Sequence, residues 1–144
     1  MASFTRRGES VWTGGGKDGS GKLTGESGAI SGISYSAGMR FGEEKGTNPE
    51  ELIALAHAGC FNMALAFRLA GAGHPAKKLT TTAAVKVEQE GGGWTVRSSA
   101  LTLAAEVPGL DAAEFRKLAD DAKANCPISR LLKAEVTLDA KLVG

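Results

Sequence analysis

The chain has 144 residues, a formal net charge of +1 and 42% hydrophobic residues, which suits one domain with a buried core over residues 1–144. A nearly neutral chain gives no reason to expect nucleic acid or an anionic membrane surface as a partner. No apolar stretch follows the two arginines near the start, and the longest apolar run is broken by polar residues. We therefore expect neither a secretory signal nor a membrane-spanning segment, but a cytoplasmic protein.

The first third of the chain is rich in glycine and predicts strands joined by turns. We expect strands over residues 3–13, 22–30 and 33–41, with a flexible hairpin loop between the first two. The end of this loop nearly matches a phosphate-binding loop. However, Leu23 stands where a Ser or Thr should hold magnesium, and no helix is predicted after it. The segment thus lacks two features that nucleotide binding requires.

A strong helix signal follows. Asn48 suits the N-cap, Pro49 suits the first helical position, and Glu51 stands three residues after Asn48, as in a capping box. We expect this helix to end near Gly71. Apolar residues at helical spacing predict its buried face: Ile53, Ala56, Cys60, Met63 and Phe67.

The second half of the chain predicts a hairpin, two helices and a last strand. These elements are residues 79–90 and 94–106, a helix capped by Asp111, a short helix from Pro127 to about Leu132, and residues 135–143. Because the order shows no βαβ alternation, it predicts an α+β fold with largely antiparallel sheets.

Cys60 and Cys126 are the two cysteines of the chain, and each lies in a distinctive segment. In a reducing compartment a lasting disulfide is disfavoured, so a cysteine pair more often serves catalysis or metal binding. A reactive thiol needs a nearby cation to lower its pKa. Arg68 stands eight positions past Cys60, roughly 12 Å along the helix axis, and is expected to face solvent. Arg40 ends a predicted strand ahead of the helix, from where the tertiary structure could bring it over a thiolate.

Other interpretations of these residues stay open. His57 and Cys60 are three residues apart on one helix face and with Cys126 would supply three metal ligands, although no CxxC or HxxxH motif accompanies them. Cys60 alone could be a small buried hydrophobe. Glu50 could simply favour the helix N-terminus. It precedes Cys60 by ten residues, roughly 15 Å along a straight helix, so in a site with Cys60 it would come from a second copy of the chain.

Three segments resemble motifs of the osmotically inducible protein C family (OsmC/Ohr), namely GTNPEELI at 46–53, AHAGCF at 56–61 and NCPIS at 125–129. The resemblance covers essentially the whole chain. It implies an intertwined homodimer in which sheets wrap around a long central helix. The Ohr branch carries an arginine inside the first Gly-rich loop, where this chain reads Gly15-Gly16-Lys17-Asp18-Gly19, so the OsmC branch is favoured.

The resemblance also implies a thiol peroxidase that reduces organic hydroperoxides and hydrogen peroxide. It makes Cys60 the peroxidatic cysteine, Cys126 the resolving cysteine, and Arg40 and Glu50 the charged residues of the site. It implies no metal or other cofactor, and a dithiol reductant such as a lipoylated protein. A non-catalytic redox sensor or small-ligand binder on the same fold is the alternative, because a fold does not determine a function.

Overall fold

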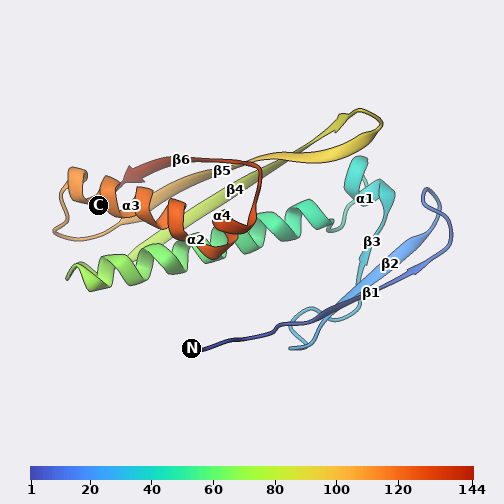
Figure 1. Cartoon of the computed structure of the whole chain (residues 1–144), viewed down its shortest axis with the longest axis horizontal. Coiled ribbons are helices and arrows are strands. Elements are labelled where there is room, and N and C mark those ends of the chain that lie inside the picture. The colour runs from blue at the N-terminus through green and yellow to red at the C-terminus, as the bar shows by residue number, and fades with distance from the viewer. The chain divides into compact units, whose positions relative to one another are not determined.

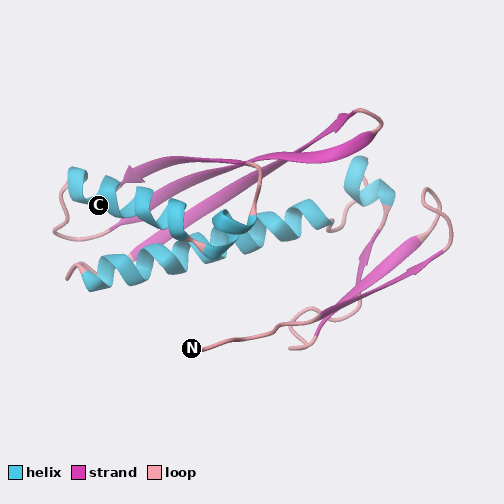
Figure 2. Ribbon diagram, viewed as in Figure 1, coloured by secondary structure: helices cyan, strands magenta, loops and turns pink.

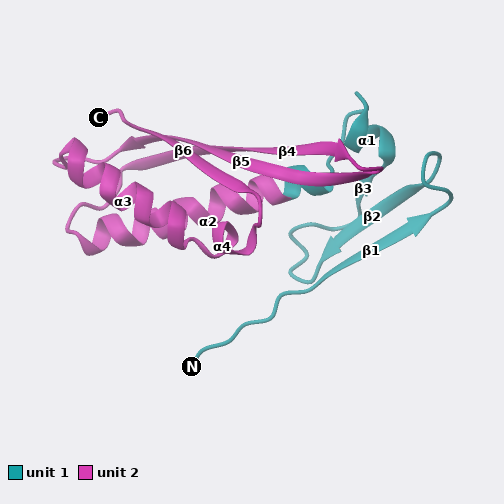
Figure 3. Cartoon of the chain, turned by 45° about the horizontal axis from the view of Figure 1, so that its top comes forward, with its two compact units in different colours: residues 1–52 teal, residues 53–144 magenta.

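The structure, a computed structural model, describes residues 1–144 (Figures 1 and 2). Its elements in chain order are β1 (Gly8–Thr13), β2 (Ser20–Gly25), β3 (Ile33–Tyr35), α1 (Ala37–Phe41), α2 (Pro49–Gly71), β4 (Lys78–Glu90), β5 (Gly93–Glu106), α3 (Ala112–Asn125), α4 (Pro127–Leu131) and β6 (Glu135–Leu142). The chain forms two compact units, residues 1–52 and residues 53–144, and the boundary falls inside α2 (Figure 3). A single domain over the whole chain stays a prediction.

The first unit contains a small antiparallel sheet in the order β1-β2-β3. The predicted hairpin loop lies between β1 and β2, and it leads into a strand rather than the helix that a phosphate-binding loop needs. Trp12 and Tyr35 pack on each other with ring centroids 5.4 Å apart. Gly21 is required beneath them, because a Cβ at this position would clash with both rings.

The prediction of a strand over residues 33–41 is wrong in its second half. β3 ends at Tyr35, and α1 follows directly. The Ser36 hydroxyl accepts a hydrogen bond from the Met39 N–H at 3.2 Å and so caps α1. Arg40 therefore lies in the last turn of a short helix and not at the end of a strand.

The start of α2 agrees with the prediction. The Asn48 side-chain oxygen accepts a hydrogen bond from the Glu51 N–H at 2.8 Å, and Pro49 is the first helical residue. The Glu51 carboxylate accepts a hydrogen bond from the Thr47 hydroxyl at 2.8 Å. This hydrogen bond replaces the one from the N-cap backbone N–H that would complete a capping box.

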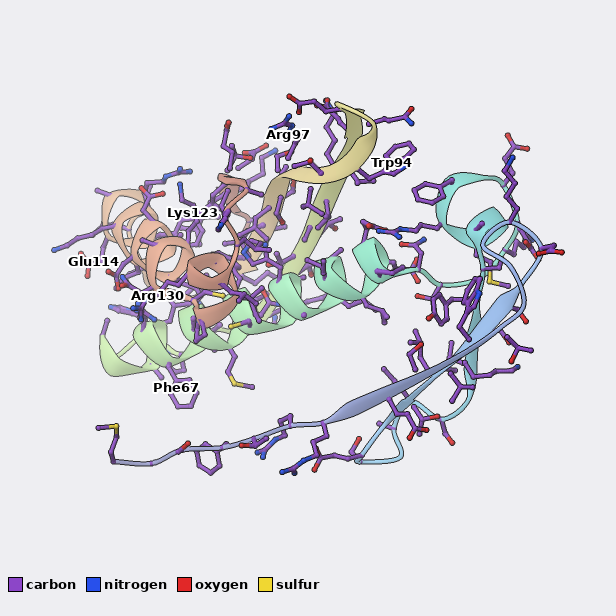
Figure 4. All side chains as sticks on the ribbon, turned by 45° about the vertical axis from the view of Figure 1, so that its right-hand side comes forward. Phe67, Trp94, Arg97, Glu114, Lys123 and Arg130 are labelled. Atoms are coloured by element: carbon purple, nitrogen blue, oxygen red, sulfur yellow. The ribbon has the colours of Figure 1, made fainter.

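The buried face of α2 differs from the predicted one. Fully buried side chains recur every four residues along it: His57, Phe61, Leu65 and Leu69. By contrast, Met63 and Phe67 are 64% and 74% exposed, and Phe67 projects from α2 on the side away from α3 (Figure 4). Cys60, between these faces, is half-buried. Because α2 is apolar on two faces, its periodicity alone could not select the one that enters the core.

α2 has 23 residues, and an 18-residue window of it has a mean hydropathy of 1.5, so by length and composition alone it is long and apolar enough to cross a membrane. A core helix of a soluble protein satisfies the same test. Here one face of α2 packs into the hydrophobic core of the second unit, although only 22% of the apolar window is buried within the chain.

The second unit is built on a sheet in the order β4-β5-β6. β4 and β5 form the predicted antiparallel hairpin, with an irregularity between Lys86 and Val87. β6 pairs with β5 in parallel, so β5, the two following helices and β6 form one βαβ unit, which the element order had not predicted. A parallel pair needs a crossover, which α3 and α4 provide (Figure 1). The α+β class and the largely antiparallel pairing are confirmed.

The core of the second unit lies between this sheet and the helices. Alternate residues of β5 point inward, and they meet the buried faces of α2 and α3. The central members of this core are Phe61, Leu65, Leu69, Leu101, Leu103, Ala105, Phe115, Ala119, Ala122 and Cys126. Cys126, at the junction of α3 and α4, is thus part of the core and is fully buried.

Replacing the N-cap of α3 tests whether the Asp111 side chain stabilises the start of this helix. The Asp111 carboxylate accepts a hydrogen bond from the Glu114 N–H at 2.9 Å. Asp111→Ala should lower the free energy of unfolding by about 1 kcal/mol, because one N–H of the first turn loses its partner. Urea denaturation followed by circular dichroism, at constant protein concentration, measures this change. Asp111→Asn is the matched control and should stay within a few tenths of a kcal/mol, since asparagine caps equally well. An equal loss in both variants would contradict the capping role.

Candidate functional site

Arg40 and Glu50 form a bidentate ion pair in the first unit. The Arg40 Nε donates to Glu50 Oε2 at 3.0 Å, and its Nη2 donates to Oε1 at 2.6 Å. Glu50 is buried at the start of α2, whereas the Arg40 side chain remains 36% exposed. Two parallel hydrogen bonds fix the plane of the guanidinium group, which a lysine could not reproduce.

The ion pair keeps both groups charged. The hydrogen bonds from Arg40 hold the pKa of the Glu50 carboxyl below its usual range, although burial opposes them. The same hydrogen bonds raise the pKa of Arg40. The Arg40 guanidinium also lies over the Phe41 ring, 4.9 Å from its centroid. The sequence-predicted charged residues are therefore brought together as an oriented cation with a buried counter-ion.

Arg40 also lines a cavity of about 130 Å³ in the same unit. Its wall includes the rings of Trp12, Tyr35 and Phe41 together with Pro49. The surroundings of the guanidinium are thus largely apolar, with the ion pair as the charged element.

Cys60 and Cys126 meet in the second unit, as free thiols. The Cys60 sulfur is within hydrogen-bonding reach of the Cys126 thiol and of the Ile128 backbone N–H. Burial raises the pKa of the Cys60 thiol, the Cys126 thiol raises it further, and the Ile128 N–H opposes both effects. Within this unit, Cys60 is therefore held in its protonated form.

The junction between α3 and α4 places Cys126 against α2. Cys126 is the C-cap of α3 and the N-cap of α4 at once: its N–H donates to the Ala122 carbonyl at 2.9 Å, and its carbonyl accepts from the Arg130 N–H at 3.1 Å. Pro127 then begins α4 at a position where a backbone N–H is not needed. This explains why Cys126 stands directly before a proline.

His57 lies one turn before Cys60 and is fully buried. Its Nδ1 is 2.6 Å from the Ser99 hydroxyl of β5, and its Nε2 is 2.8 Å from the Ser129 hydroxyl of α4. Burial lowers the pKa of His57, so the ring is neutral. Both nitrogens are occupied, so His57 does not join the two thiols as a third metal ligand, and no group of three or more His, Cys, Asp or Glu side chains is placed to hold a metal ion.

Sequence reasoning missed Ser99, Ser129 and the Ile128 N–H as members of this arrangement. Ser129 belongs to the NCPIS segment, which was a signal for it, whereas nothing in the sequence distinguishes Ser99 from other strand serines. Arg68, the other arginine considered as a partner for the thiol, forms an ion pair with Asp121 of α3.

Comparison with known proteins agrees with these features. A model of the family described as OsmC-like protein matches residues 42–141. The chain is 44% identical over 137 residues to Peroxiredoxin OsmC of Escherichia coli (strain K12), which covers 95% of this chain and 96% of the relative.

Solved structures share the fold. An OsmC-like protein from Mycoplasma pneumoniae superposes with a TM-score of 0.79 at 15% identity, over 99% of this chain and 100% of that one. An organic hydroperoxide resistance protein from Elizabethkingia anophelis superposes with a TM-score of 0.71 at 25% identity, over 99% and 98% of the two chains. With its family match, its close relative and its fold in agreement, this chain belongs to the OsmC family.

Proposed function

We propose that this chain is a peroxiredoxin-like thiol peroxidase, which reduces organic hydroperoxides and hydrogen peroxide through Cys60 and Cys126. The observation that carries the proposal is the contact between the two free thiols, which come from α2 and from the start of α4. The relationship to proteins named peroxiredoxin supports the same activity. Its physiological role is then antioxidant defence under oxidative stress.

The first step oxidises Cys60. The Cys60 thiolate attacks the terminal oxygen of the hydroperoxide, and the O–O bond breaks as the S–O bond forms. The alkoxide leaves and takes up a proton as the alcohol, or as water when the substrate is hydrogen peroxide. The product on the protein is a Cys60 sulfenic acid.

The second step uses Cys126. Its sulfur attacks the Cys60 sulfur, a Cys60–Cys126 disulfide forms, and the sulfenic oxygen leaves as water. An external dithiol must then reopen the disulfide by exchange and becomes a disulfide itself. A lipoylated protein is the reductant we propose, because its two thiols form a ring when oxidised. We propose a cytoplasmic location, because a reducing compartment supplies dithiol donors of this kind.

Arg40 and Glu50 supply the charge that the thiol pair lacks. Burial raises the Cys60 pKa, so a cation is needed to generate the thiolate. We propose that Arg40 stabilises the thiolate and polarises the peroxide, while Glu50 holds the guanidinium plane through its two hydrogen bonds.

The ion pair and the thiols of one site come from two copies of the chain in this proposal. Glu50 and Cys60 are ten residues apart on α2, roughly 15 Å along the axis. A homodimer would also cover the second apolar face of α2, where Met63 and Phe67 are 64% and 74% exposed. Exposed apolar side chains on one face of a helix are typical of a protein interface.

Cysteine variants test the two chemical steps. Cys60→Ser should abolish peroxide consumption, because the attacking sulfur is lost. Cys126→Ser should consume about one to two equivalents of peroxide per chain and then stall, since the sulfenic acid has no resolving partner and a second peroxide molecule can only oxidise it to sulfinic acid. Consumption of cumene hydroperoxide with dihydrolipoamide as donor measures both. Slow oxidation of the wild type without repeated turnover would instead support a redox sensor.

Thiol titration tests the role of Arg40. In a Cys126→Ser background, the rate of iodoacetamide alkylation against pH reports the pKa of Cys60. Arg40→Ala should move this pKa upward, because burial then acts without the opposing cation, and alkylation at neutral pH should slow about tenfold for each pKa unit. Arg40→Lys keeps the charge without the bidentate pair, so its Cys60 pKa should lie between those of the protein with Arg40 and the Arg40→Ala variant. Identical profiles for all three proteins would remove Arg40 from the site.

Mixed dimers test whether the site is shared. A Cys60→Ser chain and an Arg40→Ala chain are each expected to be inactive alone. In a mixed dimer, Cys60 of one chain meets Arg40 of the other, so one of two sites is intact and up to half of the wild-type activity should return. Co-expression with two different affinity tags isolates this species. No recovery in a verified mixed dimer, or a monomeric mass by light scattering at micromolar concentration, would rule out a shared site.

A further inference from the structure

The buried His57 connects three elements around the thiol pair. It bonds Ser99 on β5 at 2.6 Å and Ser129 on α4 at 2.8 Å, and it belongs to α2 itself. A neutral imidazole has one donor and one acceptor nitrogen, and a serine hydroxyl can take either role, so both hydrogen bonds can form in either tautomer. No buried side-chain nitrogen or oxygen is left without a partner.

α4 needs an anchor of this kind. It has five residues and no side-chain hydrogen bond at its N-cap, and so short a helix has little stability of its own. Its N-cap is Cys126, and its second residue is Ile128, whose N–H reaches the Cys60 sulfur. The orientation of α4 therefore sets both the position of the resolving sulfur and one hydrogen bond to the peroxidatic sulfur.

The same turn of α2 carries the anchor and the peroxidatic thiol. His57 and Cys60 are three residues apart, which places them side by side on a helix. The bond from His57 to Ser129 thus ties the helix that holds Cys60 to the helix that holds Cys126. Disulfide formation demands Cα atoms roughly 4.4 to 6.8 Å apart. Holding two reactive groups in such a geometry greatly accelerates their reaction.

We infer that His57 is a positioning residue for the resolving step, acting on Cys126 through the Ser129 hydroxyl. The inference rests on the proposed peroxidase function. In the reaction, the Cys60 sulfenic acid and the Cys126 thiol form a disulfide and release water. If the hydrogen bond between Ser129 and His57 is lost, α4 carries the Cys126 thiol away from the Cys60 sulfenic acid. The sulfenic acid then persists, and a second peroxide molecule oxidises it to sulfinic acid.

Two serine variants separate positioning from general packing. Ser129→Ala and Ser99→Ala each remove one hydroxyl from the same imidazole, but only the first cuts the link to α4. Rapid-quench mass spectrometry, after reduction and removal of the donor, follows the sulfenic acid and the disulfide separately. In Ser129→Ala the sulfenic acid should form at the wild-type rate, the disulfide should form about tenfold more slowly, and sulfinic acid should accumulate with rising peroxide. Ser99→Ala leaves the link to α4 in place, so it should slow disulfide formation less than Ser129→Ala does.

Ser129→Thr keeps the hydroxyl and should restore the rate of disulfide formation. A second measurement is the equilibrium between thiols and disulfide in dithiothreitol buffers, where Ser129→Ala should favour the thiols about tenfold more than wild type does. Equal slowing in both alanine variants, or none in Ser129→Ala, would overturn the inference, as would failure of the threonine variant to recover. A wild type in which peroxide never oxidises Cys60 would contradict the proposed function instead, so the two failures are distinguishable.

Discussion

The contact between the Cys60 and Cys126 thiols depends on how a five-residue helix is held against a long one. α4 has no strong cap, so its place is set by tertiary contacts: Cys126 in the core at one end and the Ser129–His57 hydrogen bond in its middle. A buried imidazole is costly unless both nitrogens are satisfied, and here two serine hydroxyls satisfy them. The polar core residue thereby specifies which surface of α2 the short helix can meet.

The two parts of the proposed site obey opposite electrostatic rules. Around the thiols, burial disfavours charge and raises the Cys60 pKa. Around Arg40, a bidentate partner stabilises charge and lowers the Glu50 pKa in spite of burial. The two groups are complementary, because the neutral Cys60 thiol needs a cation to form its thiolate and the Arg40 guanidinium is already charged. The peroxidase chemistry needs both conditions, and in the proposed dimer the second copy brings them together.

The two apolar faces of α2 explain the main error in the expected core. Ile53, Ala56, Cys60, Met63 and Phe67 form a regular apolar line, but Met63 and Phe67 are exposed. The face that enters the core contains a histidine, which a hydrophobic pattern disfavours. A helix with two apolar faces has more than one packing partner, and a protein that covers both by association leaves this signature in its sequence.

The sequence by itself determined the local structure and the identity of the reactive groups. Asn48, Pro49, Asp111 and Pro127 define where helices begin, because caps and first-turn prolines act over a few residues. The two cysteine segments identified the family and the thiol chemistry. Only the tertiary structure decided that Arg40 lies on a helix beside Glu50, that β6 runs parallel to β5, and that His57 is shared between Ser99 and Ser129. These are contacts between residues distant in the chain, and local propensity carries no information about which distant partner a side chain will meet.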